Sequence, residues 1–244
     1  MMPKTDWRRV AAPAALFLAA SCVVVVWIML AVPDPQRYPV RGIDVSHHQG
    51  KIDWDALTGE KLSFAYIKAS EGADFRDERF SENLRGAAAA GIPAGGYHFF
   101  TFCRPGAVQA ENFLGALEGA PAGLLPPVID LEFQGNCRER PSAQALREEL
   151  SDFTAVVERR LGSAPVFYVT TEFLNAYGDA MPAKGEIWIR SVFFHPDRTF
   201  RRPWVFWQFA GEGTVKGIEG PVDLDVFNGS AVEWKAYIER RRCR

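Results

Sequence analysis

The sequence predicts an α/β barrel, because strand-like and helix-like segments alternate along most of its 244 residues. Eight segments have the length and composition of strands, and each of the first five is followed by a helix-like segment. Helices become sparse after the fifth strand. The chain therefore has the pattern of a barrel whose outer helices thin out toward its end.

The elements follow in chain order. We expect strands at residues 40–45, 64–68, 94–100, 128–133, 166–170, 187–190, 205–209 and 222–227. We expect helices at residues 54–57, 78–90, 107–117, 142–161, 172–177 and 231–241. Gly91 ends the second helix, and the fourth is amphipathic because its apolar residues recur at helical spacing: Leu146, Leu150, Phe153, Val157 and Leu161.

The N-terminal segment differs from the rest of the chain. Residues 10–32 carry no charge and follow a basic stretch, residues 1–9, that contains Lys4, Arg8 and Arg9. This length suits a transmembrane signal-anchor, with residues 1–9 in the cytoplasm and the remainder outside it. A cleaved signal peptide is the alternative and would release a secreted protein, but its apolar region is usually only about 7–15 residues long. A Pro-rich, extended linker at 33–39 would join the anchor to one catalytic domain at 40–244.

Composition and cysteine placement agree with an exported globular domain. With 48% hydrophobic residues, 24% charged residues and a formal net charge of −2, the chain gives no reason to expect a nucleic-acid partner. Cys103 and Cys137 follow the third and fourth strands, so a disulfide between them is plausible in an oxidising compartment, and two reduced thiols are the alternative. Cys243 is then unpaired. We expect a monomer.

Two acids, Asp130 and Glu132, give the strongest chemical signal. They end an apolar strand, and residues two apart in a strand face the same side. Neighbouring carboxyl groups push their pKa values apart, which supplies an acid and a base near neutral pH. Functional side chains gather at the carboxyl ends of barrel strands, where this chain carries further acids and aromatic residues: Asp44, Asp223, Tyr66, Tyr97, Tyr168 and Trp207. This set suits a carbohydrate cleft.

Six segments, in order, resemble family 25 of the glycoside hydrolases, the Chalaropsis-type lysozymes (N-acetylmuramidases): residues 42–50, 64–72, 95–100, 127–132, 207–209 and 222–229. The resemblance implies a flattened, irregular TIM-like barrel of five β/α units followed by three strands. It also implies hydrolysis of the β-1,4 bond between N-acetylmuramic acid and N-acetylglucosamine in peptidoglycan, with no metal and no cofactor.

Carried over by position, the resemblance makes Glu132 the general acid. It makes Asp130 the residue that stabilises developing charge or orients the 2-acetamido group of the substrate. Asp44 and Asp223 match the other two acids of the subsite. The aromatic residues match sugar-binding positions: Tyr66, Tyr97, Tyr168 and Trp207. The chain departs from the family at Asp225, where Asn is common, and this extra acid would shift the pH optimum or point into a polar turn.

Other interpretations stay open at this point. The histidines at 47, 48 and 98 with Asp44 would suit a metal-dependent polysaccharide hydrolase or deacetylase, although His47 and His48 would face opposite sides of a regular strand. An inactive, membrane-tethered glycan-binding module is a third class. Asp130 and Glu132 would form structural ion pairs in the plainest alternative, with Arg138 or Arg190 as partners. Lys68 suits an ion pair with an acid at the mouth of the barrel.

Overall fold

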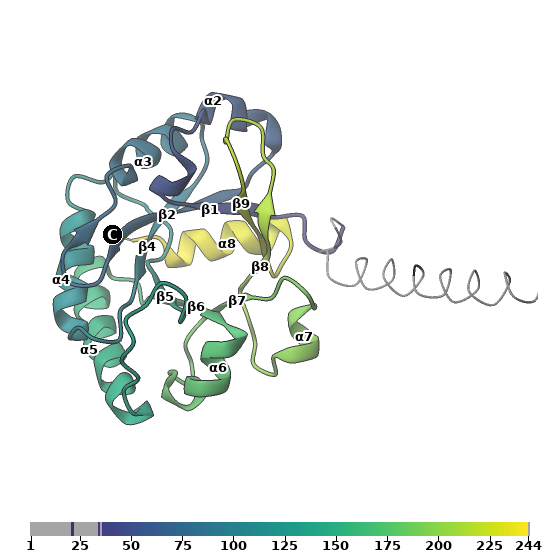
Figure 1. The fold of residues 1–244 in the computed structure, drawn as a ribbon. Helices are drawn as coiled ribbons and strands as arrows, with labels where there is room; N and C mark the ends of the chain where they lie inside the picture. Colours follow the sequence, from purple (N-terminus) through teal and green to yellow (C-terminus); the bar gives the residue numbers. More distant parts are fainter. Residues whose placement is uncertain (1–20, 22–33, 35, 244) are drawn as a thin grey trace, which may run out of the picture.

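The computed structural model describes residues 21, 34 and 36–243, which form a barrel surrounded by helices (Figure 1). Eight strands close the ring in the order β1-β2-β4-β5-β6-β7-β8-β9, and β9 returns to β1. The first seven of these run parallel, whereas β9 is antiparallel to both of its neighbours. The strands are β1 Arg41–Val45, β2 Phe64–Glu71, β4 Ala94–Phe99, β5 Val128–Leu131, β6 Val166–Thr170, β7 Ile187–Arg190, β8 Phe206–Gly213 and β9 Val222–Phe227.

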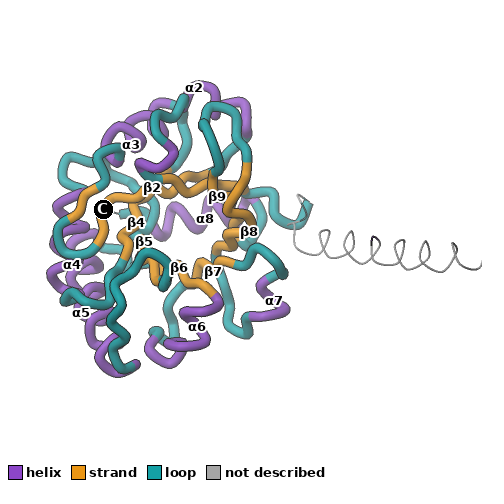
Figure 2. The backbone as a smooth tube through the Cα atoms, in the orientation of Figure 1, coloured by secondary structure: helices purple, strands orange, loops and turns teal. Residues whose placement is uncertain are grey.

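Helices cover the outside of the ring and become sparse after β6, the fifth predicted strand, as the sequence predicts (Figure 2). They are α2 Trp54–Leu57, α3 Phe80–Ala89, α4 Gly106–Ala116, α5 Ala143–Leu161, α6 Thr171–Tyr177, α7 Pro196–Thr199 and α8 Ala231–Arg241. Two elements were not predicted from the sequence: α7 and the two-residue strand β3, Phe75–Arg76, which pairs with the end of β2. Both elements are too short to show a period.

Local signals fix the ends of the longer helices. Ser142 accepts a hydrogen bond from the Ala145 N–H at the start of α5, and Gly162 ends this helix in the left-handed conformation, with φ of 67°. Ser230 and Glu233 form a reciprocal capping box at the start of α8.

The core has two parts, one outside the strand ring and one inside it. Outward-facing strand residues pack against the helices, whereas inward-facing aromatic residues fill one end of the barrel interior. Helix α8 closes that end with Trp234 and Tyr237, whose rings stack on each other and lie against Phe206 and Phe227 (Figure 1). Only the opposite end, where the parallel strands finish, is free to hold a pocket.

The chain enters the barrel through a turn. The predicted linker at 33–39 is only partly described, and its described part is not extended, because the Tyr38 N–H bonds back to the Asp34 carbonyl at 2.8 Å. Tyr38 is buried, and its hydroxyl contacts His195 at 2.7 Å. The predicted segments 1–9 and 10–32 lie, apart from Ser21, outside the described residues. Within the described part of the chain, no helix is both long and apolar enough to cross a membrane.

Candidate active site

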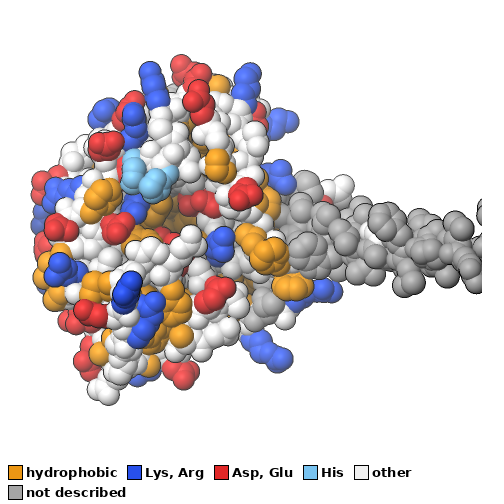
Figure 3. All heavy atoms as spheres, viewed as in Figure 1, with side chains coloured by type: hydrophobic (Ala, Val, Ile, Leu, Met, Phe, Trp, Pro, Cys, Tyr) orange, Lys and Arg blue, Asp and Glu red, His pale blue; other side chains and the backbone are white. Residues whose placement is uncertain are grey.

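A pocket of about 430 Å³ opens at the carboxyl ends of the parallel strands. In the space-filling view, the hollow on this face is bordered by acidic and basic side chains and by a pale-blue histidine pair (Figure 3). Six residues predicted for the site line the pocket: Asp44, Tyr97, Asp130, Glu132, Tyr168 and Asp223. They come from five different strands or strand ends, which the closed ring brings together.

Asp130 lies on the inward face of β5, and Glu132, the residue that directly follows this strand, lines the same pocket, as strand periodicity predicts. Asp130 is 8% exposed, and its Oδ1 atom is buried with no hydrogen-bond partner among the described residues. Burial and the charge of Glu132 raise the pKa of Asp130 well above its usual range. Glu132 is half-buried, and burial raises its pKa to about 7 although the Arg190 charge opposes the shift. The pair thus holds protons at a pH where ordinary carboxyl groups are ionised.

Asp44 and Asp223 are direct neighbours across the β1–β9 ladder. The Gln208 amide donates a hydrogen bond to Asp44 Oδ2 at 2.8 Å, and the Tyr168 hydroxyl donates to Gln208 Oε1 at 2.9 Å. Burial raises the pKa of Asp44 to about 6, and burial with the Asp44 charge raises the pKa of Asp223 to about 8. A polar chain therefore runs from Tyr168 through Gln208 to Asp44.

Two basic residues, Lys68 and Arg190, line the pocket beside the acids. Lys68 Nζ pairs with Glu71 Oε2 at 2.6 Å, which agrees with the predicted ion pair to an acid at the mouth. The Arg190 charge favours the ionised forms of Asp44, Glu132 and Asp223. Among the described residues, Asp130 and Glu132 form no ion pair with Arg138 or Arg190. The plain alternative of a structural ion pair therefore has no support.

Two of the aromatic residues predicted to bind sugar lie outside the pocket lining. Tyr66 is fully buried inside the barrel, where its ring contacts Phe64, Trp188 and Phe206. Trp207 is also fully buried, but it points outward, and its Nε1 donates to the Ser191 carbonyl at 2.8 Å. Neither side chain lines the pocket, so the prediction that they bind sugar is wrong.

Two further residues that were not predicted for the site, Gln208 and Trp188, also line the pocket. Strand alternation carries the signal for Gln208, because Phe206 and Gln208 share a face of β8 and Trp207 must then take the other. Trp188 precedes Arg190 by two residues on β7 and so points inward beside it.

The three histidines considered as metal ligands do not converge, because His98 lies apart from the neighbouring His47 and His48. His98 points away from the pocket and contacts Ser70 at 2.9 Å and Gln109 at 3.2 Å. His47 contacts Asp77 at 2.7 Å, whereas His48 lies at the pocket rim. Across the described ranges, no group of three or more histidine, cysteine or acidic residues is arranged to hold a metal ion.

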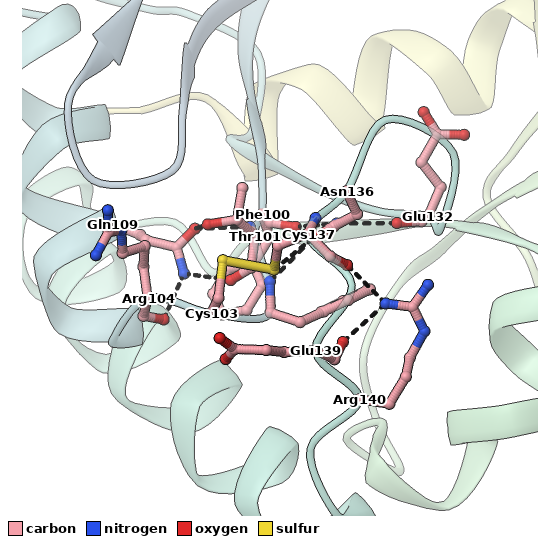
Figure 4. The surroundings of a disulfide bond; sticks show 11 residues. Phe100, Thr101, Cys103, Arg104, Gln109, Glu132, Asn136, Cys137, Glu139 and Arg140 are labelled. Carbon is pink, nitrogen blue, oxygen red and sulfur yellow. Dashed lines mark hydrogen bonds between the residues drawn. A yellow bond between two sulfur atoms is a disulfide. The ribbon is translucent and has the colours of Figure 1, made fainter.

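A disulfide and an asparagine hold the loop that carries Glu132 (Figure 4). Cys103 and Cys137 are joined, with Cα atoms 6.3 Å apart, so the loops after β4 and β5 are linked. Asn136 donates to the carbonyls of Phe100 at 2.8 Å and Glu132 at 3.0 Å. Its side-chain oxygen also accepts from the Phe102 N–H at 3.1 Å. In Figure 4 the Glu132 carboxyl points away from this network, toward the open side of the loop.

The fold and the pocket suit one class of protein, a barrel enzyme that hydrolyses glycosidic bonds. The chain belongs to glycosyl hydrolase family 25, and the family description "Glycosyl hydrolases family 25" matches residues 43–218.

Individual relatives agree with this assignment. The chain is 37% identical to Lysozyme M1 of Streptomyces globisporus over 205 residues, which cover 79% of this chain and 69% of that protein. A family 25 glycosyl hydrolase from Bacillus anthracis has a similar structure, with a TM-score of 0.77, 36% identity and coverage of 84% and 96%. A bacterial lysozyme from Streptomyces coelicolor gives a TM-score of 0.71, 35% identity and coverage of 82% and 97%. The chain is a glycoside hydrolase, and its family supports peptidoglycan hydrolysis.

Proposed function

We propose that this chain is an N-acetylmuramidase that cleaves the β-1,4 bond between N-acetylmuramic acid and N-acetylglucosamine in peptidoglycan. One observation carries the proposal: Glu132 lies half-buried in a pocket with a pKa of about 7, two residues from Asp130 on the same strand face. The similarity to Lysozyme M1 supports the same activity.

In this proposal Glu132 is the general acid. Because burial holds its proton at neutral pH, Glu132 donates that proton to the glycosidic oxygen as the bond from this oxygen to C1 breaks. The resulting carboxylate then accepts a proton from the water that completes hydrolysis. Pre-positioned acids of this kind typically contribute about 10²–10⁴-fold in rate.

We assign Asp130 the task of holding the 2-acetamido group of the substrate. Its Oδ1 is a buried acceptor without a donor among the described residues, and a substrate N–H would supply one. An acetamido group held in this way is oriented to attack C1 with its own oxygen, so the reaction would retain the anomeric configuration. Asp44, with a pKa of about 6, would stabilise the developing positive charge as a carboxylate, whereas Asp223 would line the same subsite. The Tyr97 and Tyr168 rings would contact the sugars.

A turbidity assay on purified peptidoglycan tests the proposal. We expect clearing that survives EDTA and falls at least about 100-fold in Glu132→Gln. Glu82→Gln is a matched control, since Glu82 lies on the surface and pairs with Arg79. Clearing lost on EDTA treatment would support the metal-dependent alternative, and binding without clearing would support an inactive module. NMR of the first products checks the stereochemistry, and inversion would contradict substrate assistance.

We further propose that the catalytic domain works outside the cytoplasm as a monomer, with residues 10–32 as its membrane anchor. The uncharged length of this segment and its basic N-terminal flank support the proposal. A tethered enzyme reaches only nearby glycan, which suits remodelling of the cell's own wall. Full-length protein in the membrane fraction, with its domain accessible from outside, is the expected result. Abundant soluble enzyme in the medium would contradict it.

A further inference from the structure

A second acid on β9, Asp225, lies beside the proposed machinery without a role in it. Its side chain is fully buried and shares the inward strand face with Asp223. Trp188 Nε1 donates a hydrogen bond to Asp225 Oδ1 at 2.9 Å, whereas Oδ2 is buried with no donor among the described residues. A carboxylate left half-satisfied in the interior is costly, so this arrangement needs an explanation.

The immediate neighbours of Asp225 are acids rather than cations. The Asp44 carboxyl is within hydrogen-bonding contact of the Asp225 carboxyl, and Asp223 lies two residues along the strand. In the described part of the chain, Asp225 forms no ion pair. Burial and the charges of Asp44 and Asp223 therefore raise the pKa of Asp225 well above its usual range.

The other charged groups of the pocket lie beyond this first set. They are Arg190 on β7, which acts on Asp44 and Asp223, Lys68 on β2, and the two acids of β5.

We propose that Asp225 is a protonated positioning residue whose Oδ2–H donates a hydrogen bond to the Asp44 carboxylate. Two facing carboxyl oxygens attract each other only when one of them carries a proton. Asp44 accepts a bond from Gln208 and lies near Arg190, both of which favour its ionised form, so the proton belongs on Asp225. Asp44 then accepts from two donors, Gln208 and Asp225, and these fix the orientation of its carboxylate in the pocket.

Infrared spectroscopy of the full-length protein at pH 7 tests the protonation directly. The wild-type minus Asp225→Asn difference spectrum should show the carbonyl stretch of a protonated carboxyl group. Asp77→Asn is a matched control at a buried acid that accepts hydrogen bonds from the His47 and Arg79 N–H groups, and it should lose carboxylate bands instead. Loss of carboxylate bands in Asp225→Asn would overturn the proposal.

The pH profile of peptidoglycan clearing tests the positioning role, which rests on the proposed function. Asp225→Leu removes both the acceptor for Trp188 and the donor to Asp44, so we expect activity to fall about tenfold or more. Asp225→Asn keeps an acceptor and a donor, and should recover most of that loss with the acidic limb of the profile unmoved. Removing an ionised Asp225 would instead shift that limb by about one pH unit or more toward acid, and would contradict the proposal.

These readouts separate the two proposals. If wild-type protein clears no peptidoglycan, the proposed function fails, but the infrared spectrum still decides the protonation of Asp225. If Asp225→Leu does not fold, the Asn variant and its pH profile still decide the positioning role. A Leu variant that folds and retains full activity would contradict that role.

Discussion

Loss of the Cys103–Cys137 disulfide should strongly destabilise the catalytic domain. The two cysteines are 34 residues apart in the chain, and the entropy of closing such a loop in the unfolded state corresponds to about 4 kcal/mol at 25 °C. The free energy of unfolding of the double variant Cys103→Ala/Cys137→Ala should therefore be lower by about the same amount. This loss arises in the unfolded chain, so the native fluorescence spectrum should change little.

Urea unfolding followed by tryptophan fluorescence measures this effect through the midpoint concentration. Reductant should lower the wild-type midpoint to that of the double variant and leave the double variant unchanged. Cys243→Ala is a useful control, because Cys243 is free and buried far along the chain from both loops. A double variant within about 1 kcal/mol of wild type would refute the entropic argument and leave the Asn136 network as the element that holds these loops.

Three further predictions concern single groups. Asn136→Ala strips the partners from the Phe102 N–H and the Glu132 carbonyl, so unfolding free energy should drop by about 1–3 kcal/mol and kcat should fall; an unchanged denaturant midpoint would contradict this. The rate of clearing should peak between pH 6 and 7, because Asp44 must be ionised, above about pH 6, and Glu132 must be protonated, below about pH 7. A rate that stays constant up to pH 9 would show that Glu132 is not the general acid. Tyr66→Phe should leave activity unchanged, because Tyr66 does not line the pocket. Thermal unfolding should show a stability equal to that of wild type or about 1 kcal/mol higher, since the buried hydroxyl has no described partner. A large loss of activity would show that Tyr66 contributes to the site.

Strand alternation explains why most of the candidate site could be predicted from the sequence. A residue's face is fixed once the strand is recognised, because a one-residue slip would turn every side chain over. Asp130 and Glu132 therefore had to point the same way. Closure of the ring pairs β1 with β9, which places Asp44 and Asp223 opposite each other on neighbouring strands. The same rule, applied to β8, separates Trp207 from the inward-facing Gln208.

Depth inside the barrel could not be predicted in the same way. Tyr66 is the neighbour of Asp44 across the β1–β2 ladder, yet its ring turns into the aromatic cluster closed by α8 while Asp44 lines the pocket. Side-chain direction along the barrel axis depends on packing against distant residues such as Trp188 and Phe206. The Asn136 network was missed for a related reason, since it joins two loops that have no period.

The acids proposed for catalysis should also make the folded state sensitive to alkali. Four inward carboxyl groups line the pocket together with Lys68 and Arg190, and a fifth, that of Asp225, is buried beside them. Burial raises the pKa values of all five: Asp44, Asp130, Glu132, Asp223 and Asp225. An acid with a raised pKa binds its proton more tightly in the folded state than in the unfolded chain. Its stabilising contribution is complete below about pH 4, the pKa in the unfolded chain. The contribution is lost as pH rises to the pKa of the folded state, at up to about 1.4 kcal/mol per pH unit for each group. Stability should thus decline from mildly acidic to alkaline pH.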